Sequence, residues 1–190
     1  MRHAWRVSVD GMQRTFIVVS GLPGSGKTTL GRKLATALHL PYYDKDDILD
    51  GLLETLGAAD PAWRQKLSRA SDEVLIRLVT SSAGAVVASF WRTVKTPKGS
   101  GTPIDWLEGL SANVLEIHCS CSPETAAARF KERRRHPGHW DDPRSLDELI
   151  GSFRTLSEAG PLGLGDVIVV DTGTDSDLAA LVEEIRVRRG

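Results

Sequence analysis

The chain has 190 residues, with 24 lysines and arginines against 25 aspartates and glutamates, for a net charge of −1. This length suits one domain over residues 1–190, and the balanced charge excludes a general attraction to nucleic acid or to anionic membranes. No apolar run approaches the roughly 20 residues that cross a bilayer, and the extension at 1–14 lacks the apolar core of a signal peptide, so we expect a cytoplasmic protein without a membrane partner.

The predicted elements alternate between strand and helix along the whole chain. Short apolar runs are typical of strands buried in a parallel sheet, whereas apolar residues three or four apart are typical of helices. Asp60 and Pro61 mark the start of the longest helix, as an N-cap followed by proline at the first helical position. In chain order we expect a strand at 15–20, a helix around Leu30, Leu34 and Leu38, a strand at 40–44, a helix around Ile48, Leu52, Leu53 and Leu56, a helix at 61–82, strands at 85–89 and 113–119, helices at 123–135 and about 145–158, a strand at 167–171 and a helix at 176–188.

This alternation predicts an α/β fold, in which helices cover both faces of a parallel sheet through right-handed crossovers. Segments rich in glycine and proline at 96–103 and 136–143 predict surface loops, and loops of this length in a small domain often cover a ligand. Cys119 and Cys121 stand two apart in a predicted strand, a spacing that rarely allows a disulfide, so we expect free thiols.

The stretch GLPGSGKTT at 21–29 fits the pattern G-x-x-x-x-G-K-[ST] between a predicted strand and a predicted helix. Glycines allow a tight turn with inward-facing amide hydrogens, and the positive end of the next helix adds to the attraction for phosphate. Close packing of a turn is the alternative, but packing does not require Gly-Lys-Thr at a helix start. We therefore predict that nucleoside triphosphate is bound by Gly21, Leu22, Pro23, Gly24, Ser25, Gly26, Lys27, Thr28 and Thr29.

Three side chains of this stretch have separate predicted roles. Lys27 would bridge the β- and γ-phosphates as a catalytic group, and the Thr28 hydroxyl would bind Mg²⁺. Thr29, next on the helix, would reach the α-phosphate.

Acidic residues follow the second predicted strand, in DKDD at 44–47. Ligands of open parallel sheets lie beyond the carboxyl ends of the strands, so these carboxylates are placed where an acceptor would be activated. In phosphoryl transfer a carboxylate commonly orients or deprotonates the attacking group, and we assign this catalytic role to Asp46. Asp44 is assigned to the metal through a water molecule. The alternatives are that Asp46 or Asp47 only caps the next helix and that Asp44 only ends a strand.

A second charged stretch joins an arginine-rich helix to the loop at 136–143. Arg129 and Arg133 are four residues apart, so we expect them on one face of that helix. We predict a lid at about 129–146 that swings both arginines over the triphosphate, with Arg133 as a catalytic group. Arginines that only face solvent are the alternative.

Taken together, these motifs resemble the small P-loop kinases and are similar to the group of shikimate kinases, gluconate kinases and chloramphenicol phosphotransferases. The resemblance rests on GLPGSGKTTL, YYDKDDILDGLLETLG, SFW, HCSCSPETAAARFKERR and HPGH, and it covers about residues 15–188. It implies a three-layer α/β/α P-loop NTPase fold, with a five-stranded parallel sheet of order 2-3-1-4-5 and a helical lid. It also implies transfer of the γ-phosphate of ATP, with Mg²⁺, to a hydroxyl of an antibiotic, sugar or metabolite, and it leaves the oligomeric state open.

Carried over residue by residue, the resemblance places Asp46 on the acceptor-activating carboxylate and Arg133 on a lid arginine. It places Thr172, after the fifth strand, near the adenine. The chain departs from related sequences at Ser89, because they often have an acidic residue in the third strand, and this departure bears on how metal and acceptor are held.

Three further residues are assigned to the acceptor site. Trp91 and Arg92 follow the third strand on the acceptor side, and His139 lies in the predicted lid. For Trp91, as for Phe90, a place in the core is the alternative. His136 and His139 lack a third ligand for a metal site, so a contact to phosphate or acceptor is the better interpretation of His139.

Two other functions are alternatives to small-molecule phosphorylation. One is an ATPase switch, since VIVVD ends at Asp171 and matches an apolar strand that closes with a metal-binding acid, although in the last strand. The other is a nucleotide or polynucleotide kinase, which the balanced charge and the lack of an aromatic and basic stretch disfavour.

Overall fold

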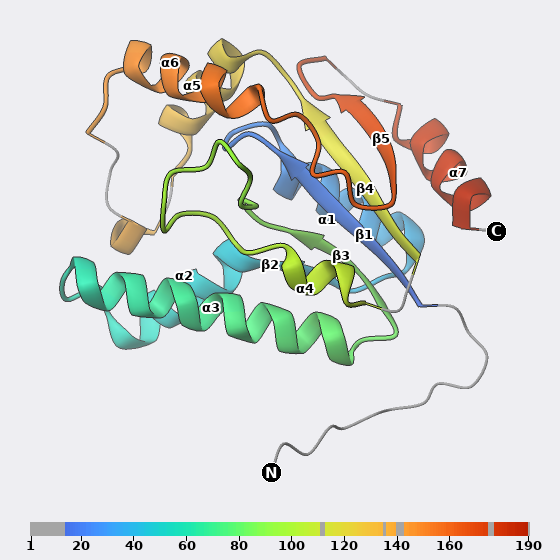
Figure 1. Ribbon diagram of the computed structural model, residues 1–190, viewed down its shortest axis with the longest axis horizontal. Coiled ribbons are helices and arrows are strands. Elements are labelled where there is room, and N and C mark those ends of the chain that lie inside the picture. Colours follow the sequence, from blue (N-terminus) through green and yellow to red (C-terminus); the bar gives the residue numbers. More distant parts are fainter. Residues whose placement is uncertain (1–13, 111–112, 135, 140–142, 175–176, 190) are drawn as a thin grey trace.

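Five parallel strands form one sheet, in the order β2-β3-β1-β4-β5 (Figure 1). The computed structural model describes residues 14–110, 113–134, 136–139, 143–174 and 177–189, so the predicted N-terminal extension lies outside the described residues except for Arg14. The strands are β1 (Thr15–Gly21), β2 (Tyr42–Asp44), β3 (Gly84–Ala88), β4 (Asn113–Ser120) and β5 (Asp166–Asp171). The predicted strands and their order are therefore confirmed.

Helices connect these strands and form the outer layers. They are α1 (Lys27–Leu38), α2 (Lys45–Leu56), α3 (Pro61–Ser81), α4 (Asp105–Glu108), α5 (Pro123–Glu132), α6 (Leu146–Ser157) and α7 (Leu178–Arg189), with a short 3-10 turn, η1, at Pro137–His139. In Figure 1, α1 and α7 lie behind the sheet, α3 and α4 lie in front of it, and α5 and α6 lie together beyond the ends of the strands. Among the described residues, no helix is long and apolar enough to cross a membrane.

The central strand β1 is buried on both faces. Ile17 and Val19 point into the core formed with α1 and α7, whereas Phe16 and Val18 point into the core formed with α3 and α4. All four side chains are fully buried, and each contributes about 1.5–3 kcal/mol of hydrophobic stabilisation. This alternation explains why the run TFIVVS reads as continuously apolar.

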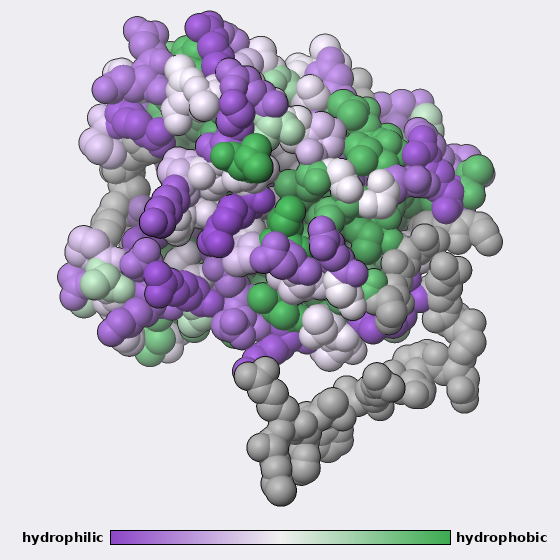
Figure 2. Space-filling view, viewed as in Figure 1, coloured by the Kyte–Doolittle hydropathy of each residue, from purple (hydrophilic) through white to green (hydrophobic). Residues whose placement is uncertain are grey.

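At β5, the expectation that helices cover both faces of the sheet is wrong. Ile168 and Val170 are buried toward α7, but Val169 is 60% exposed on the other face. Figure 2 shows a hydrophobic surface region over β4 and β5 on that face. The apolar residues of β5 therefore have two different environments: Ile168 and Val170 are buried on one face, and Val169 is exposed on the other.

The helix that follows β4 is shorter than its sequence pattern predicts. It ends at Glu132 instead of residue 135, and Arg133 is its C-cap with extended backbone angles of φ −67° and ψ 122°. Arg129 and Arg133 therefore do not share one helical face. This difference matters for the site, because leaving the helix lets Arg133 reach a different segment from Arg129.

A buried carboxylate joins β4 to the segment that leads into β5. Glu116 is fully buried, and its oxygens accept hydrogen bonds from the backbone N–H groups of Leu162, Gly163 and Leu164 at 2.8, 2.9 and 3.3 Å. The Ser20 hydroxyl of β1 donates to Glu116 Oε1 at 2.5 Å. These bonds compensate the burial of the charge and hold residues 162–164 against the sheet.

We predict that Glu116→Gln destabilises the fold by about 1–3 kcal/mol, because an amide in place of the carboxylate leaves at least one buried N–H donor without an acceptor. Urea unfolding should show a lower midpoint at unchanged slope. The control Glu73→Gln changes an exposed residue of α3 and should shift stability by less than about 0.5 kcal/mol. Equal midpoints for both variants would contradict the proposed role of Glu116.

Candidate active site

The glycines of the 21–29 loop are required by contacts with neighbouring backbone. Gly21, Gly24 and Gly26 have φ values of 127°, 80° and 88°, which other residues rarely adopt. A Cβ at Gly24 would overlap the carbonyl oxygen of Ala126 in α5, and one at Gly21 would overlap that of Cys119 in β4. The loop is therefore clamped between β4 and α5, and its conformation is set before any ligand binds.

The start of α1 has no side-chain cap among the described residues. Gly26 is its N-cap and supplies no side-chain hydrogen bond, and the first turn carries no acidic residue. By contrast, side-chain oxygens cap α2, α3, α5 and α6, from Asp44, Asp60, Ser122 and Ser145. The first N–H groups of a helix need an acceptor, and together with the helix dipole they attract an anion. The geometry at α1 therefore fits a phosphate group.

Lys27 lies inside the loop with its ammonium group turned toward the backbone. Its Nζ donates to the carbonyl oxygens of Gly21 and Leu22 at 2.9 and 2.7 Å. Burial lowers the pKa of Lys27, and the nearby charges of Asp46 and Asp44 act in the opposite direction. A buried ammonium favours an additional anion beside it, so Lys27 fits the predicted role at the phosphates.

Thr28 and Asp44 lie together at the edge of the loop. Thr28 Oγ1 donates to Asp44 Oδ2 at 2.9 Å, and the Tyr42 hydroxyl donates to the same oxygen at 2.8 Å. Because the Thr28 proton is used in this bond, the lone pairs of its oxygen can face a cation. The pair of a hydroxyl and a carboxylate is also the donor chemistry that Mg²⁺ prefers. These two residues fit a magnesium ion that is bound together with the phosphates.

Asp44 has a second role, as the N-cap of α2. Its Oδ1 accepts from the backbone N–H of Asp46 at 3.0 Å. The alternative that Asp46 or Asp47 caps this helix is therefore wrong. Burial raises the pKa of Asp44, as does the charge of Asp46, whereas the hydrogen bonds from Tyr42, Asp46 N–H and Thr28 lower it.

Asp46 pairs with the lid. Arg133 NH2 lies 2.9 Å from Asp46 Oδ2, and both side chains are partly exposed. The neighbouring Asp47 instead pairs with Arg32 on the surface at 2.8 Å. Of the two carboxylates, Asp46 thus lies within electrostatic range of both Lys27 and Arg133, as the prediction for a catalytic group requires.

Arg129 and Thr172 form a separate cluster on the other side of the loop. Arg129 NH1 donates to the Thr172 carbonyl at 2.9 Å, and the Thr172 hydroxyl donates to the carbonyls of Ser25 and Ser120. This cluster ties the ends of β4 and β5 to the phosphate loop. The roles of Arg129 and Thr172 in nucleotide binding stay predictions.

The lid turn η1 is docked onto α2 and α3. His139 is buried, and its Nε2 forms a hydrogen bond with Asp50 of α2. Arg64 of α3 lies 3.5 Å from the other ring nitrogen, at the limit of hydrogen bonding. The predicted lid therefore contacts α2 through His139 and Arg133 and approaches α3 through His139, and a contact of His139 with an acceptor stays a prediction.

The two acceptor-site residues after β3 face different ways. Trp91 is buried, donates from Nε1 to the Val19 carbonyl at 2.9 Å and packs against Trp106. Arg92 donates to the carbonyls of Ser100 and Gly101, at 3.0 Å each, and so closes its own loop. Trp91 thus belongs to the core and also lines a cavity beside the phosphate loop, whereas Arg92 supports a loop, and their contact with an acceptor stays a prediction.

A chain of polar contacts occupies the end of β3 where the sequence has Ser89. Ser89 Oγ lies 2.6 Å from Thr102 Oγ1, which donates to Asp72 Oδ1 at 2.8 Å. Asp72 in turn pairs with Lys45 at 3.0 Å, next to Asp46 in α2. A carboxylate from α3 therefore reaches this corner, although the residue that directly follows β3 is a serine.

Three polar residues in or near the site were not expected from the sequence. They are Glu116 and His118 of β4 and Asp72 of α3. Glu116 and His118 alternate with apolar residues in NVLEIHC, and this period of two places both on one face of β4, a signal that could have identified them. Asp72 gave no such signal, because a charged residue in a long amphipathic helix usually faces solvent.

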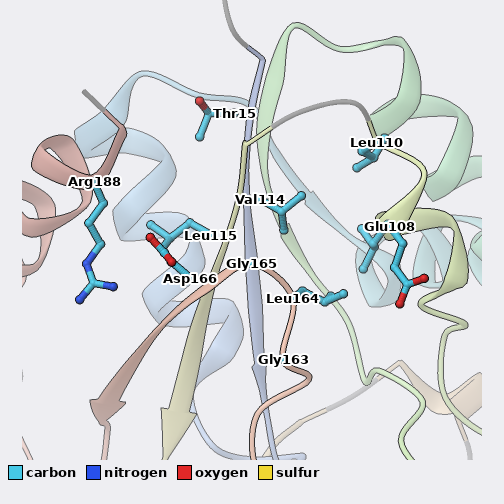
Figure 3. Close-up of a pocket in the computed structure, with 11 residues that line it drawn as sticks. Thr15, Glu108, Leu110, Val114, Leu115, Gly163, Leu164, Gly165, Asp166 and Arg188 are labelled. Atoms are coloured by element: carbon cyan, nitrogen blue, oxygen red, sulfur yellow. The ribbon is translucent and has the colours of Figure 1, made fainter.

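Two cavities differ in their distance from this site. One of about 120 Å³ adjoins the phosphate loop and is lined by residues of β1, β4, α6 and the segment after β3. The larger one, of about 430 Å³, opens at the opposite edge of the sheet, where Thr15, Val114 and Asp166 lie at the starts of their strands (Figure 3). The larger cavity contains none of the predicted site residues, so it is not the candidate active site.

Comparisons with known proteins agree with this geometry. Residues 16–100 match the model of the Cytidylate kinase-like family. The shikimate kinase of Shewanella amazonensis is 31% identical over 173 residues, which cover 87% of this chain and 91% of that protein. A candidate kinase from Chloroflexus aurantiacus superposes with a TM-score of 0.76 at 27% identity, covering 93% of this chain and 98% of that one. The shikimate kinase of Aquifex aeolicus superposes with a TM-score of 0.55 at 19% identity, covers 90% of this chain and 94% of its own, and shows the fold alone.

The matching relatives extend over nearly the whole chain. The chain therefore belongs to the P-loop small-molecule kinases, the family that includes the shikimate kinases, and it is a kinase that acts on a hydroxyl acceptor.

Proposed function

We propose that the protein transfers the γ-phosphate of Mg-ATP to a hydroxyl of a small molecule, with Asp46 as the carboxylate that orients and deprotonates that hydroxyl. The observation that carries the proposal is the position of Asp46. It lies on the first turn of α2, within electrostatic range of Lys27 in the phosphate loop, and it is paired with Arg133 of the lid.

On the nucleotide side, the backbone N–H groups at the start of α1 and the Lys27 ammonium hold the phosphates. Thr28 would hold Mg²⁺ directly, and the Asp44 carboxylate would hold it through water. The bound ion would neutralise charge on the phosphate oxygens. Arg129 and Thr172 support the nucleotide side of the loop. These groups act by position and charge, which is the main source of catalysis in phosphoryl transfer.

On the acceptor side, Asp46 takes the proton of the attacking hydroxyl. The acceptor oxygen forms a bond to the γ-phosphorus as the bond from that phosphorus to the β–γ bridging oxygen breaks, and ADP leaves with that oxygen. During the transfer, Arg133 releases the Asp46 carboxylate and pairs with the transferring phosphoryl group instead. This exchange stabilises the developing charge and makes the carboxylate available for the proton.

An acceptor screen tests the proposal. Release of ADP is followed with Mg-ATP and a panel of hydroxyl compounds, and mass spectrometry looks for the gain of one phosphate on the compound. We expect at least one acceptor to raise nucleotide turnover many-fold. Turnover that no acceptor changes would instead support an ATPase.

We predict that Lys27→Ala loses most ATP binding and turnover, because the loop then lacks its only buried ammonium beside the phosphates among the described residues. Calorimetric titration with Mg-ATP and circular dichroism separate lost binding from lost folding. Lys33→Ala, which removes an exposed lysine from the same helix, serves as the control and should bind ATP normally. Full activity of Lys27→Ala would refute the assignment.

Asp46→Asn should leave ATP affinity nearly unchanged and slow phosphoryl transfer roughly a hundredfold or more, since an amide cannot accept the proton of the hydroxyl. The measurement is kcat for transfer beside the Kd for ATP. Asp47→Asn removes the adjacent surface carboxylate, which pairs with Arg32, and should retain the rate. If both variants transfer phosphate at the native rate, Asp46 does not act as the base.

A further inference from the structure

A hydrogen-bonded chain of three side chains crosses from β4 to β1 below the phosphate loop. Glu116 Oε1 accepts from the Ser20 hydroxyl at 2.5 Å, and Ser20 Oγ lies 2.8 Å from His118 Nδ1. The direct separation of His118 Nδ1 and Glu116 Oε1 is 3.9 Å, so Ser20 lies between the two as the connecting group. Glu116 is anchored on its other side by three backbone N–H groups.

The direction of these bonds fixes the protonation pattern of the imidazole. Ser20 has one proton, and it is donated to Glu116. Ser20 Oγ must therefore accept from His118, which places the ring proton on Nδ1. Burial lowers the pKa of His118, the charge of Lys27 acts in the same direction and that of Glu116 opposes them. The ring is thus neutral at pH 7, and its Nε2 is a bare acceptor with no partner among the described residues.

His118 lines the cavity of about 120 Å³ that adjoins the phosphate loop. Thr93, Thr96 and Ser157 contribute to its wall, as do the aromatic residues Phe90 and Trp91. Gly21 and Leu22 of the phosphate loop form part of the same wall, and their carbonyl oxygens accept from the Lys27 ammonium. A molecule in the cavity therefore lies beside the loop that is assigned to the phosphates.

The cavity offers no unpaired charge to a ligand among the described residues. Its lining contains no lysine, arginine, aspartate or glutamate. At the rim, Lys95 follows the wall formed by the segment after β3, Glu158 follows the wall formed by α6, and the two pair with each other at 2.7 Å. A carboxylate in the cavity would lose its hydration without gaining a cation, which is unfavourable.

We propose that this cavity binds the body of the phosphate acceptor, that His118 Nε2 accepts a hydrogen bond from one of its hydroxyl groups, and that the acceptor is an uncharged hydroxyl compound with a ring or apolar part. His118 is then a binding residue, and Ser20 and Glu116 are positioning residues that hold its tautomer. The inference rests on the proposed function and deepens it, because it separates this chain from relatives named for shikimate, which carries a carboxylate.

Matched acceptors test the charge of the substrate. Shikimate is compared with its methyl ester, gluconate with glucose, and the panel adds myo-inositol and uridine as uncharged compounds. Where a pair is phosphorylated, we expect kcat/KM to be at least tenfold higher for its uncharged member. Otherwise, we expect kcat/KM for an uncharged compound of the panel to exceed that for both acids by the same factor. Faster phosphorylation of shikimate or gluconate than of every uncharged compound overturns the inference and leaves the proposed function intact.

Variants of His118 test the hydrogen bond. His118→Phe removes the acceptor atom and should raise KM for the best uncharged acceptor about tenfold, with kcat and KM for ATP changed less than threefold. His118→Gln, whose amide oxygen can occupy the Nε2 position, should recover most of the affinity. His39→Asn, at an exposed left-handed position after α1, is the control and should match the native protein. A KM that is unchanged in His118→Phe overturns the role of His118.

The tautomer itself is measured by nitrogen-15 NMR of the histidine rings in the native protein at pH 7. We expect a protonated Nδ1 and a bare Nε2 for His118, assigned by loss of its signals in His118→Gln. A proton on Nε2 overturns the inference without any use of an acceptor. If ATP is turned over and no compound in the panel receives phosphate, the proposed function fails, and the inference that rests on it fails with it.

Discussion

The backbone N–H groups at the start of α1, which have no side-chain cap among the described residues, are the constraint on which the rest of the site depends. They are presented by a loop whose glycines contact the backbone of β4 and α5 so closely that no Cβ fits at Gly21 or Gly24. The surrounding elements thus fix the loop before a ligand arrives. Thr172 also holds the ends of β1, β4 and β5 together, because its hydroxyl donates to the carbonyls of Ser25 in the loop after β1 and of Ser120 in β4.

The lid adds a second set of contacts that connect nucleotide and acceptor sides. Arg133 leaves α5 and pairs with Asp46, while His139 of η1 contacts Asp50 on the same helix. Both pairs join the lid to α2, which also carries Asp44 as its cap. The helix α2 therefore contacts the predicted lid, bears the predicted base and has as its cap the carboxylate beside Thr28.

Buried polar groups link the fold to the predicted acceptor site. Glu116 holds the segment before β5 and, through Ser20, also sets the tautomer of His118. Asp72 brings a carboxylate from α3 to the corner beside Ser89, where β3 has none. In each case the carboxylate is bound by groups from two or more segments of the chain.

The sequence by itself determined the alternation of strands and helices, the phosphate loop and the place of Asp46 after the second strand, because apolar periodicity and the spacing of Gly, Lys and Thr are local patterns that a linear reading contains. The order of the strands came from the resemblance to the P-loop kinases, and the structure confirms it. It also indicated that Arg133 belongs to the lid. Only the tertiary structure decided that Arg133 pairs with Asp46 and that Glu116, Ser20 and His118 form one chain. The physical reason is that Arg133 and Asp46 lie 87 residues apart and Ser20 and His118 lie 98 residues apart, so these partners meet only after the strands align and no local pattern encodes their contact.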